Sequence, residues 1–221
     1  QGSGDLSAAR AVLAEAEVTA AEIGDDDLVN TVTEARAGQS DREGNPANAI
    51  DLWRGMLSGA KKQKEWPLLQ RAYHQVGLLE LSLGNHEGAR TALKESLELA
   101  REIVDVNGVA STLHSLAVCH LQAGEAQQAR ELLAESQELS HRFGFVRLSR
   151  LNDAYQAALK ADLGALQEGI HELEALVDRW EDPSDKLGLL KAEFLLGNTY
   201  KKAGRVGPTN KHYVRALQLA R

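Results

Sequence analysis

The side chains best suited to chemistry lie near the middle of the chain: His74, His114, Cys119 and His120. Imidazole and thiolate groups bind zinc, and a Cys/His pair can act as base and nucleophile. A metal site needs three or four converging ligands, however, and covalent catalysis needs an orienting third group and an oxyanion site. Cys119 takes a position that holds Leu79 and Leu159 in the flanking repeats described below, which predicts a small buried core residue. We therefore predict no metal site and no catalytic residue.

The sequence also lacks the loops that hold nucleotide phosphates. Neither Gly-x-Gly-x-x-Gly nor Gly-x4-Gly-Lys-Ser/Thr occurs. Glutamate pairs such as Glu131 and Glu135 have the spacing of a solvated helix face. We expect a protein that is not an enzyme and that binds no cofactor.

The elements that must position these residues are helical hairpins, of which residues 69–103 form the clearest. Apolar residues recur every three or four positions in both halves of this stretch, which is the spacing of two amphipathic helices. Gly84-Asn85 joins the halves, because glycine enters the left-handed conformation of a helix C-terminus without a Cβ clash. Gly77 and Ala89 are small residues within the two helices, and they predict that the two backbones approach closely.

The hairpin returns at a fixed period, which the glycines mark as Gly4, Gly44, Gly84, Gly124, Gly164 and Gly204. Small residues stand seven positions before the glycines, namely Ala37, Gly77, Ala117, Ala157 and Gly197, and five positions after them, namely Ala9, Ala49, Ala89, Ala129, Gly169 and Thr209. Large apolar residues stand nine positions after the glycines: Leu13, Trp53, Leu93, Leu133, Leu173 and Tyr213. Such self-similarity at a period of about 40 residues indicates a solenoid of repeated supersecondary units.

The pattern predicts an all-α chain without strands. After a first helix over 5–23, we expect helices at 26–42, 46–62, 66–83, 86–103, 108–123, 126–142, 146–162, 165–180, 185–203 and 207–220. Residues 1–3 resemble the remnant of an expression tag. The rest, 4–221, is expected to form one array: a half repeat at 4–25 and repeats at about 26–64, 65–104, 105–144, 145–184 and 185–221. The missing first helix of the half repeat indicates a piece of a longer protein.

Composition excludes several classes of protein. With 43% hydrophobic and 26% charged residues, the chain is typical of a soluble globular protein. No apolar run approaches the roughly 20 residues that span a bilayer, and no signal peptide is present. The single cysteine fits a reducing compartment, so we expect a cytoplasmic protein without a membrane partner. The net charge of −7 argues against a nucleic-acid partner, because phosphate binding needs clustered Lys and Arg.

Charge is distributed unevenly along the chain. Residues 1–30 hold seven acids and one base, whereas the residues after Glu193 hold six bases and no acid. Besides solvated helix faces, two interpretations stay open. One is an acidic ligand held near the C-terminal repeats, and the other is salt-sensitive self-association of two chains through their oppositely charged ends.

The spacing small-x6-Gly-x4-Ala-x3-large within a helical hairpin resembles the tetratricopeptide repeat. The resemblance is closest at Gly77, Gly84, Ala89 and Leu93, and at Ala117, Gly124, Ala129 and Leu133. The period exceeds the usual length of roughly 34 residues, as in variants found in bacterial signalling proteins and transcription regulators. Gly169 replaces the consensus alanine, and the proline that commonly closes the repeat is absent. The resemblance implies a right-handed superhelical solenoid of antiparallel helical hairpins.

The resemblance also implies that the first helix of each hairpin lines a concave, peptide-binding groove. Carried over position by position, the lining consists of Arg71, His74, Leu78, Leu81, Ser111, His114, Val118, Leu121, Leu151, Ala154, Ala158, Lys191, Phe194 and Asn198. The charged clamp that chaperone-binding members use for a C-terminal carboxylate is not matched here. An apolar groove floor instead favours an amphipathic helix or an extended apolar segment of a partner protein.

The function implied by the resemblance is that of a scaffold or adaptor that binds a protein or peptide and does no chemistry. The alternative is a ligand-sensing or peptide-sensing module of a larger bacterial signalling protein or transcription regulator.

Overall fold

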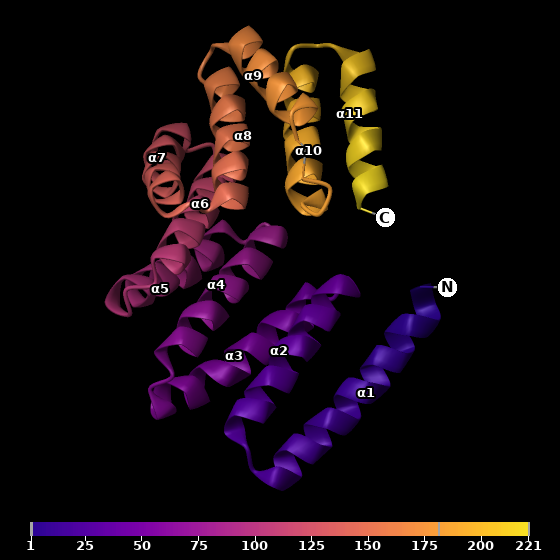
Figure 1. Ribbon diagram of the computed structural model, residues 1–221, viewed down its shortest axis with the longest axis vertical. Helices are drawn as coiled ribbons and strands as arrows, with labels where there is room; N and C mark the ends of the chain where they lie inside the picture. The colour runs from indigo at the N-terminus through magenta and orange to yellow at the C-terminus, as the bar shows by residue number, and fades with distance from the viewer. Residues whose placement is uncertain (1, 181, 221) are drawn as a thin grey trace. The chain divides into compact units, whose positions relative to one another are not determined.

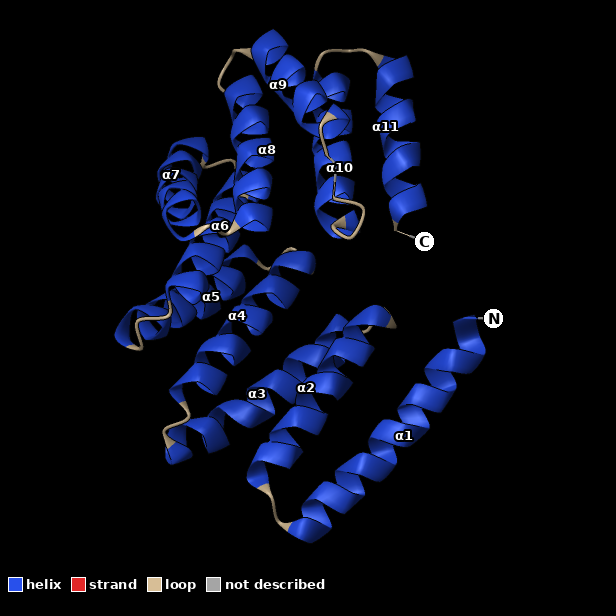
Figure 2. Cartoon of the chain, viewed as in Figure 1, coloured by secondary structure: helices blue, strands red, loops and turns tan. Residues whose placement is uncertain are grey.

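The computed structural model describes residues 2–180 and 182–220, and all regular structure in these ranges is helical (Figure 2). The helices are α1 (Gly2–Ile23), α2 (Asp26–Arg42), α3 (Pro46–Gln63), α4 (Trp66–Ser82), α5 (His86–Glu102), α6 (Val106–Gln122), α7 (Ala126–Phe143), α8 (Val146–Asp162), α9 (Leu166–Asp178), α10 (Lys186–Lys202) and α11 (Val206–Leu219). From α2 to α11, the predicted ends differ from these by at most two residues. The predicted all-α repeat fold is confirmed.

The chain divides into two compact units, Gln1–Gly108 and Val109–Arg221, called unit 1 and unit 2 below. The boundary falls within α6. Within each unit, helices that follow one another in the chain pack as antiparallel neighbours, as α4 with α5 and α10 with α11 (Figure 1).

Most of the helices end in a turn of the same geometry. Residues with positive φ recur at a constant interval up to Gly164, and one more follows at Gly204; they are Gly24, Gly44, Lys64, Gly84, Val104, Gly124, Gly144, Gly164 and Gly204. At Gly84, where φ is 76°, the amide of Asn85 donates to the carbonyl of Glu80 over 2.9 Å, and the amide of Gly84 donates to that of Leu81 over 3.1 Å. These are the two bonds of a Schellman motif, which satisfy carbonyls at the helix end.

The next helix begins directly after that turn. The side chain of Asn85 accepts a hydrogen bond from the amide of Gly88 over 3.1 Å, and Asp105 does the same for Gly108 over 3.0 Å. An Asn or Asp at this N-cap position satisfies one of the free amides of the first helical turn. The αL residue and the cap together reverse the chain within three residues, and this fixes the antiparallel packing.

The columns of small and large residues seen in the sequence form the cores of both units. In unit 1, Ala37, Ala49 and Trp53 belong to one buried cluster. In unit 2, Leu133 and Leu173 are fully buried. The helices of a hairpin approach so closely that side chains at the small positions would collide. A Cβ on Gly77 would lie 2.6 Å from Leu93, and one on Gly169 would lie 2.5 Å from the carbonyl oxygen of Ala157.

The loop between α9 and α10 is longer than the others, because α9 ends at Asp178. Asp182 accepts hydrogen bonds from the amide of Ser184 over 2.9 Å and from its hydroxyl over 2.6 Å. These two bonds lower the pKa of the Asp182 carboxyl, and the nearby charges of Arg147 and Arg150 lower it further. The Asp182 side chain thus stabilises a local turn, and the helix does not continue there. Asp185 then caps the N-terminus of α10.

Candidate functional site

In unit 1, the predicted groove residues lie on α4. Arg71 is exposed, and its guanidinium donates over 2.8 Å to Glu34 of α2, so this position faces the corresponding helix of the preceding hairpin. His74 and Leu78 are half-buried. Leu81 is buried, and it therefore offers little surface to a partner.

In unit 2, His114 is a packing residue of the interior. Its Nδ1 lies 2.7 Å from the amide oxygen of Asn152, and its ring packs edge-on against Tyr155 with centroids 5.0 Å apart. Asn152 in turn donates to the hydroxyl of Ser136 over 2.9 Å, and that hydroxyl donates to the carbonyl of Ala110 over 2.8 Å. This polar network ties α6, α7 and α8 together, because each buried polar group needs a partner.

Two further predicted residues, Ala154 and Ala158, are buried in the core cluster that α8 and α10 share. Small residues let these two helices pack closely, which removes both side chains from any open surface. Ser111, Val118, Leu121 and Leu151 are half-buried, and Leu121 packs against the core cluster around Leu133. Fewer of the groove residues predicted for unit 2 are therefore accessible to a partner than the resemblance implies.

The remaining predicted residues lie on α10, and two of them meet α11. The Tyr213 hydroxyl donates to the side-chain oxygen of Asn198 over 2.6 Å, and the ring of Tyr213 lies 5.7 Å from that of Phe194. Phe194 borders a pocket of about 370 Å³ lined by Leu190, Phe194, Tyr213, Ala216, Leu217 and Ala220. Burial lowers the pKa of Lys191 on the same helix, an effect opposed by the charge of Asp185.

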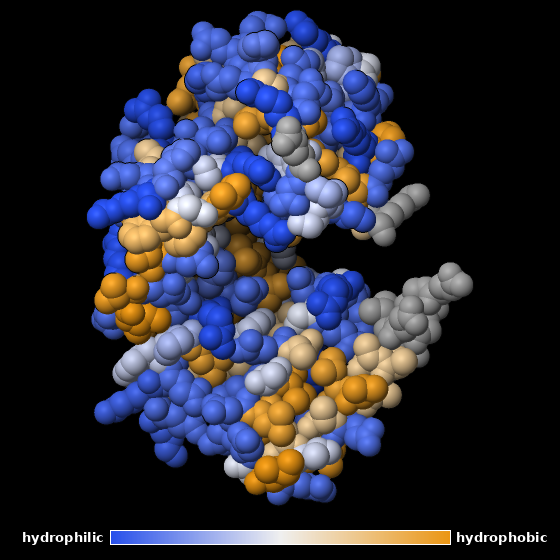
Figure 3. Space-filling model, viewed as in Figure 1, coloured by the Kyte–Doolittle hydropathy of each residue, from blue (hydrophilic) through white to orange (hydrophobic). Residues whose placement is uncertain are grey.

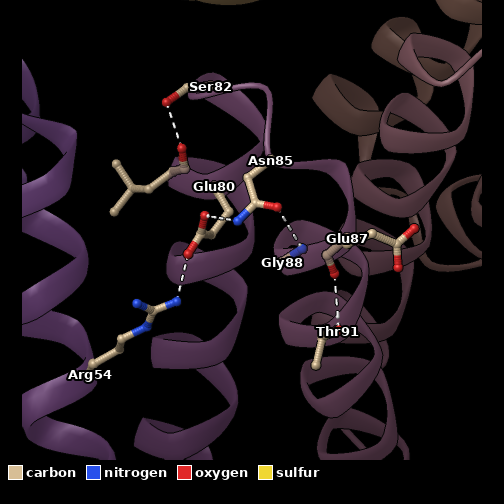
Figure 4. Close-up of polar contacts among 8 residues, drawn as sticks. Arg54, Glu80, Ser82, Asn85, Glu87, Gly88 and Thr91 are labelled. Atoms are coloured by element: carbon tan, nitrogen blue, oxygen red, sulfur yellow. Dashed lines mark hydrogen bonds and ion pairs between the residues drawn. The ribbon is translucent and has the colours of Figure 1, made fainter.

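Sequence reasoning missed a polar contact set at the turn ends of the hairpins (Figure 4). Arg54 of α3 donates over 2.6 Å to the buried carboxylate of Glu80 at the end of α4, and Asn85 donates to the same carboxylate over 2.8 Å. One repeat position in the sequence could have revealed these contacts. The position of Glu80 is polar in every repeat: Ser40, Glu80, His120, Lys160 and Tyr200.

A second polar cluster that the sequence did not reveal lies between α10 and α11. Glu193 is fully buried, and its carboxylate oxygens lie 2.7 Å from Nδ1 of His212 and 2.9 Å from Nε of Arg215. Arg215 thus compensates a charge that would otherwise be costly to bury, and the His212 ring lies at hydrogen-bond distance from the same carboxylate. Tyr200, stacked on His212, donates to Glu174; burial, followed by that contact, raises the pKa of the Tyr200 hydroxyl to about 12.

Cys119 is buried, as predicted. Within residues 2–180 and 182–220, His, Cys, Asp and Glu nowhere gather in a group of three or more that could hold a metal ion. Among the helices of the same ranges, we find none that is long and apolar enough to cross a membrane.

Residues 68–140 match the family model of the tetratricopeptide repeat. Comparison with curated proteins gave no match. The fold is similar to that of BtubC (BKLC) from P. vanneervenii, with a TM-score of 0.69 and 19% identity over 97% of this chain and 89% of that one.

Two other solved structures are also similar in fold. One is the apo form of the quorum sensor NprR from B. thuringiensis, with a TM-score of 0.75 and 15% identity over 95% of this chain and 59% of NprR. The other is aspartyl phosphate phosphatase F from Bacillus subtilis, with a TM-score of 0.74 and 16% identity over 88% of this chain and 49% of the phosphatase. The matched residues span α4 to α7, and helical hairpins of the same spacing continue on both sides of them.

Proposed function

We propose that this chain is a protein-interaction scaffold without chemistry of its own, and that it binds an amphipathic helix of a partner protein between α10 and α11. The observation that carries the proposal is the pocket lined almost wholly by apolar side chains in that cleft. Phe194 and Leu217 line it and are 51% and 64% exposed. Large apolar side chains that gather in one cleft are a feature of interaction sites.

The preceding hairpin supports a helix as the occupant. One repeat before Phe194 and Leu217 stand Ala154 and Val177, in the equivalent cleft between α8 and α9. Both are buried there, in a core cluster that includes Leu196 of α10. The fold thus already fills one such cleft with a helix, through apolar residues three or four positions apart.

The charge of this part of unit 2 supports an acidic polar face on the partner helix. The chain after Glu193 carries six bases and no acid. Some of this charge is compensated internally, since Arg215 pairs with Glu193, and Lys202 pairs with Asp162. The remaining positive potential favours an acidic partner and speeds its association.

The proposal is tested by capturing proteins from an extract of the source cells with three versions of the purified chain. Phe194→Glu places a charge in the cleft, whereas Leu187→Glu changes an exposed leucine of α10 that does not line the pocket. We expect wild type and Leu187→Glu to retain a partner protein that Phe194→Glu does not retain. Binding to Phe194→Glu should be at least about tenfold weaker, because the introduced charge must be desolvated.

Circular dichroism must show the same helix content for all three versions. Equal retention by all three would contradict the proposed cleft. A small molecule found in the wild-type fraction without protein would favour the alternative, a sensing module of a larger regulator.

Self-association is a second candidate, favoured by a specific observation on α1. This helix is acidic through Glu15, Glu17 and Glu22, and it carries exposed apolar residues, so that apolar surface lies along it in Figure 3. Those residues are Val12, Val18 and Ile23. The α1 helix of a second copy therefore has the chemistry proposed for the occupant of the α10–α11 cleft.

Light scattering after gel filtration tests this candidate. We expect a dimer or larger species at low ionic strength that dissociates in about 1 M salt, where charges are screened beyond about 3 Å. Phe194→Glu should be monomeric at both salt concentrations. If the wild-type chain is monomeric at both salt concentrations, the self-association proposal is wrong, and the proposed occupant of the cleft is then another protein.

A further inference from the structure

The Arg54–Glu80–Asn85 contacts of Figure 4 lie at a position that is repeated along the chain, and different side chains occupy that position in different repeats. The site lies between three consecutive helices, where a helix end meets its neighbours. In α3–α5, the side chain of Arg54 enters it and binds Glu80, whose carboxylate also accepts from Asn85. The positions equivalent to Arg54 are Ala14, one repeat earlier, and Lys94, Ala134, Glu174 and Val214, one to four repeats later, so that two of them are alanine.

Where alanine replaces Arg54, the site is an open pocket. The pocket between α1, α2 and α3 has a volume of about 340 Å³ and includes Ala14. The pocket between α7, α8 and the turn that leads into α9, called the α7–α9 pocket below, has a volume of about 310 Å³ and includes Ala134. At α3–α5 the long side chain of Arg54 fills this space, and at the equivalent positions of α9 and α10 Tyr200 donates to Glu174. The two sites that carry alanine are open to another molecule.

The α7–α9 pocket has the more selective lining. It consists of Arg130, Ala134, Gln156, Leu159, Lys160, Leu163 and Ala165, and this lining holds two cations and no acid. The α1–α3 pocket, in contrast, is lined by both Arg36 and Glu43 and by several amides, so its lining favours neither sign of charge.

The charges of the α7–α9 pocket are reversed relative to the occupied site. Lys160 takes the position of the Glu80 carboxylate, and apolar side chains surround it where polar ones stand in the α1–α3 pocket. Lys160 donates to Glu172 of α9, which lies outside the lining, and Glu168 is a further nearby acid. An ammonium group has three donors, so contact with Glu172 leaves two of them for a ligand.

We propose that the α7–α9 pocket binds a carboxylate that carries a short unbranched apolar chain. The carboxylate lies between Lys160 and Arg130, and the apolar chain lies on Ala134, Leu159 and Leu163. The ligand thereby completes, with opposite charges, the pair that Arg54 and Glu80 form within the chain. This site lies on other helices than the α10–α11 cleft, so its test is independent of the proposed function.

Hexanoate is the probe, with hexan-1-ol and hexylammonium as matched controls for chain and charge. We expect hexanoate to bind the wild-type chain saturably by calorimetry and to raise its melting temperature, and both controls to bind at least about tenfold more weakly, because they lack the charge-assisted hydrogen bonds. Binding of hexan-1-ol as strong as that of hexanoate would overturn the proposal, and so would the absence of any hexanoate binding.

Two variants locate the site. Ala134→Glu supplies a carboxylate from the chain itself, so it should melt at a higher temperature than wild type and no longer respond to hexanoate. Lys160→Gln should weaken hexanoate binding about tenfold or more, while Lys211→Gln, a lysine of α11 outside the pocket, should leave it unchanged.

Circular dichroism checks that each variant keeps its helix content. Should Ala134→Glu fail to fold, Lys160→Gln still decides the question. Unchanged hexanoate affinity in Lys160→Gln would overturn the proposed site, as would an equal loss of affinity in Lys211→Gln.

Discussion

Replacing Gly169 with alanine is expected to destabilise unit 2 by about 1–3 kcal/mol, the usual cost of forcing extra atoms into a packed core. The new Cβ would lie 2.5 Å from the carbonyl oxygen of Ala157 and 2.6 Å from the Cβ of Ala161. One of these contacts is with backbone, so no side-chain rotation relieves it and α8 must move away from α9. Urea unfolding followed by circular dichroism measures the change in the free energy of unfolding.

Gly207→Ala is the matched control, because Gly207 is a helical residue of the same unit with nothing packed within 4 Å of an added Cβ. Alanine is the better helix former by up to about 1 kcal/mol, so this variant should be as stable as wild type or more stable. Equal stability of Gly169→Ala and Gly207→Ala would show that α8 and α9 are not in close contact.

The second large effect is expected at the turns, where valine and glycine occupy equivalent positions. Gly84→Val should lower the free energy of unfolding by about 2 kcal/mol, because a β-branched residue is penalised in the left-handed conformation. Val104 already bears that strain at φ 59°, and its side chain is 78% exposed, so contacts of the side chain itself do little to offset the strain. Val104→Gly should therefore raise the free energy of unfolding by about 1 kcal/mol.

Both turn variants lie in unit 1, and thermal and urea unfolding of each can be compared directly with wild type. We expect changes in the free energy of unfolding of opposite sign for the two substitutions. Destabilisation by Val104→Gly would mean that Val104 contributes a contact to the fold that outweighs its backbone strain.

Helix positions were predictable because the signals for them are local and repeated. The glycines that recur once per repeat fix half of the turns, and apolar spacing supplies the helix faces between them. The turns at Lys64 and Val104 carry no glycine, yet they have the same geometry, so there the conformation follows from the packing of the flanking helices. Local sequence alone gives no sign of a left-handed residue at either position.

The candidate site was predictable only in part, because a repeat position does not determine which side chain a neighbouring helix covers. His114 and Phe194 occupy the same position of their repeats, two repeats apart. His114 is buried against Asn152 and Tyr155, whereas Phe194 is exposed beside α11. The identity of the residue on a neighbouring helix decides between these outcomes, and for His114 that residue stands a whole repeat further along the chain.

The even spacing of the αL residues also bears on how such a chain can change in evolution. Deleting residues 65–104 would join Lys64 to Asp105, so that a left-handed residue would again precede an aspartate that caps the next helix. Unequal recombination could therefore remove or duplicate whole hairpins while each remaining helix keeps its face toward the core. An insertion of one residue within a helix would instead turn every later side chain of that helix by about 100°. Gene length in this lineage should consequently vary in blocks of one hairpin.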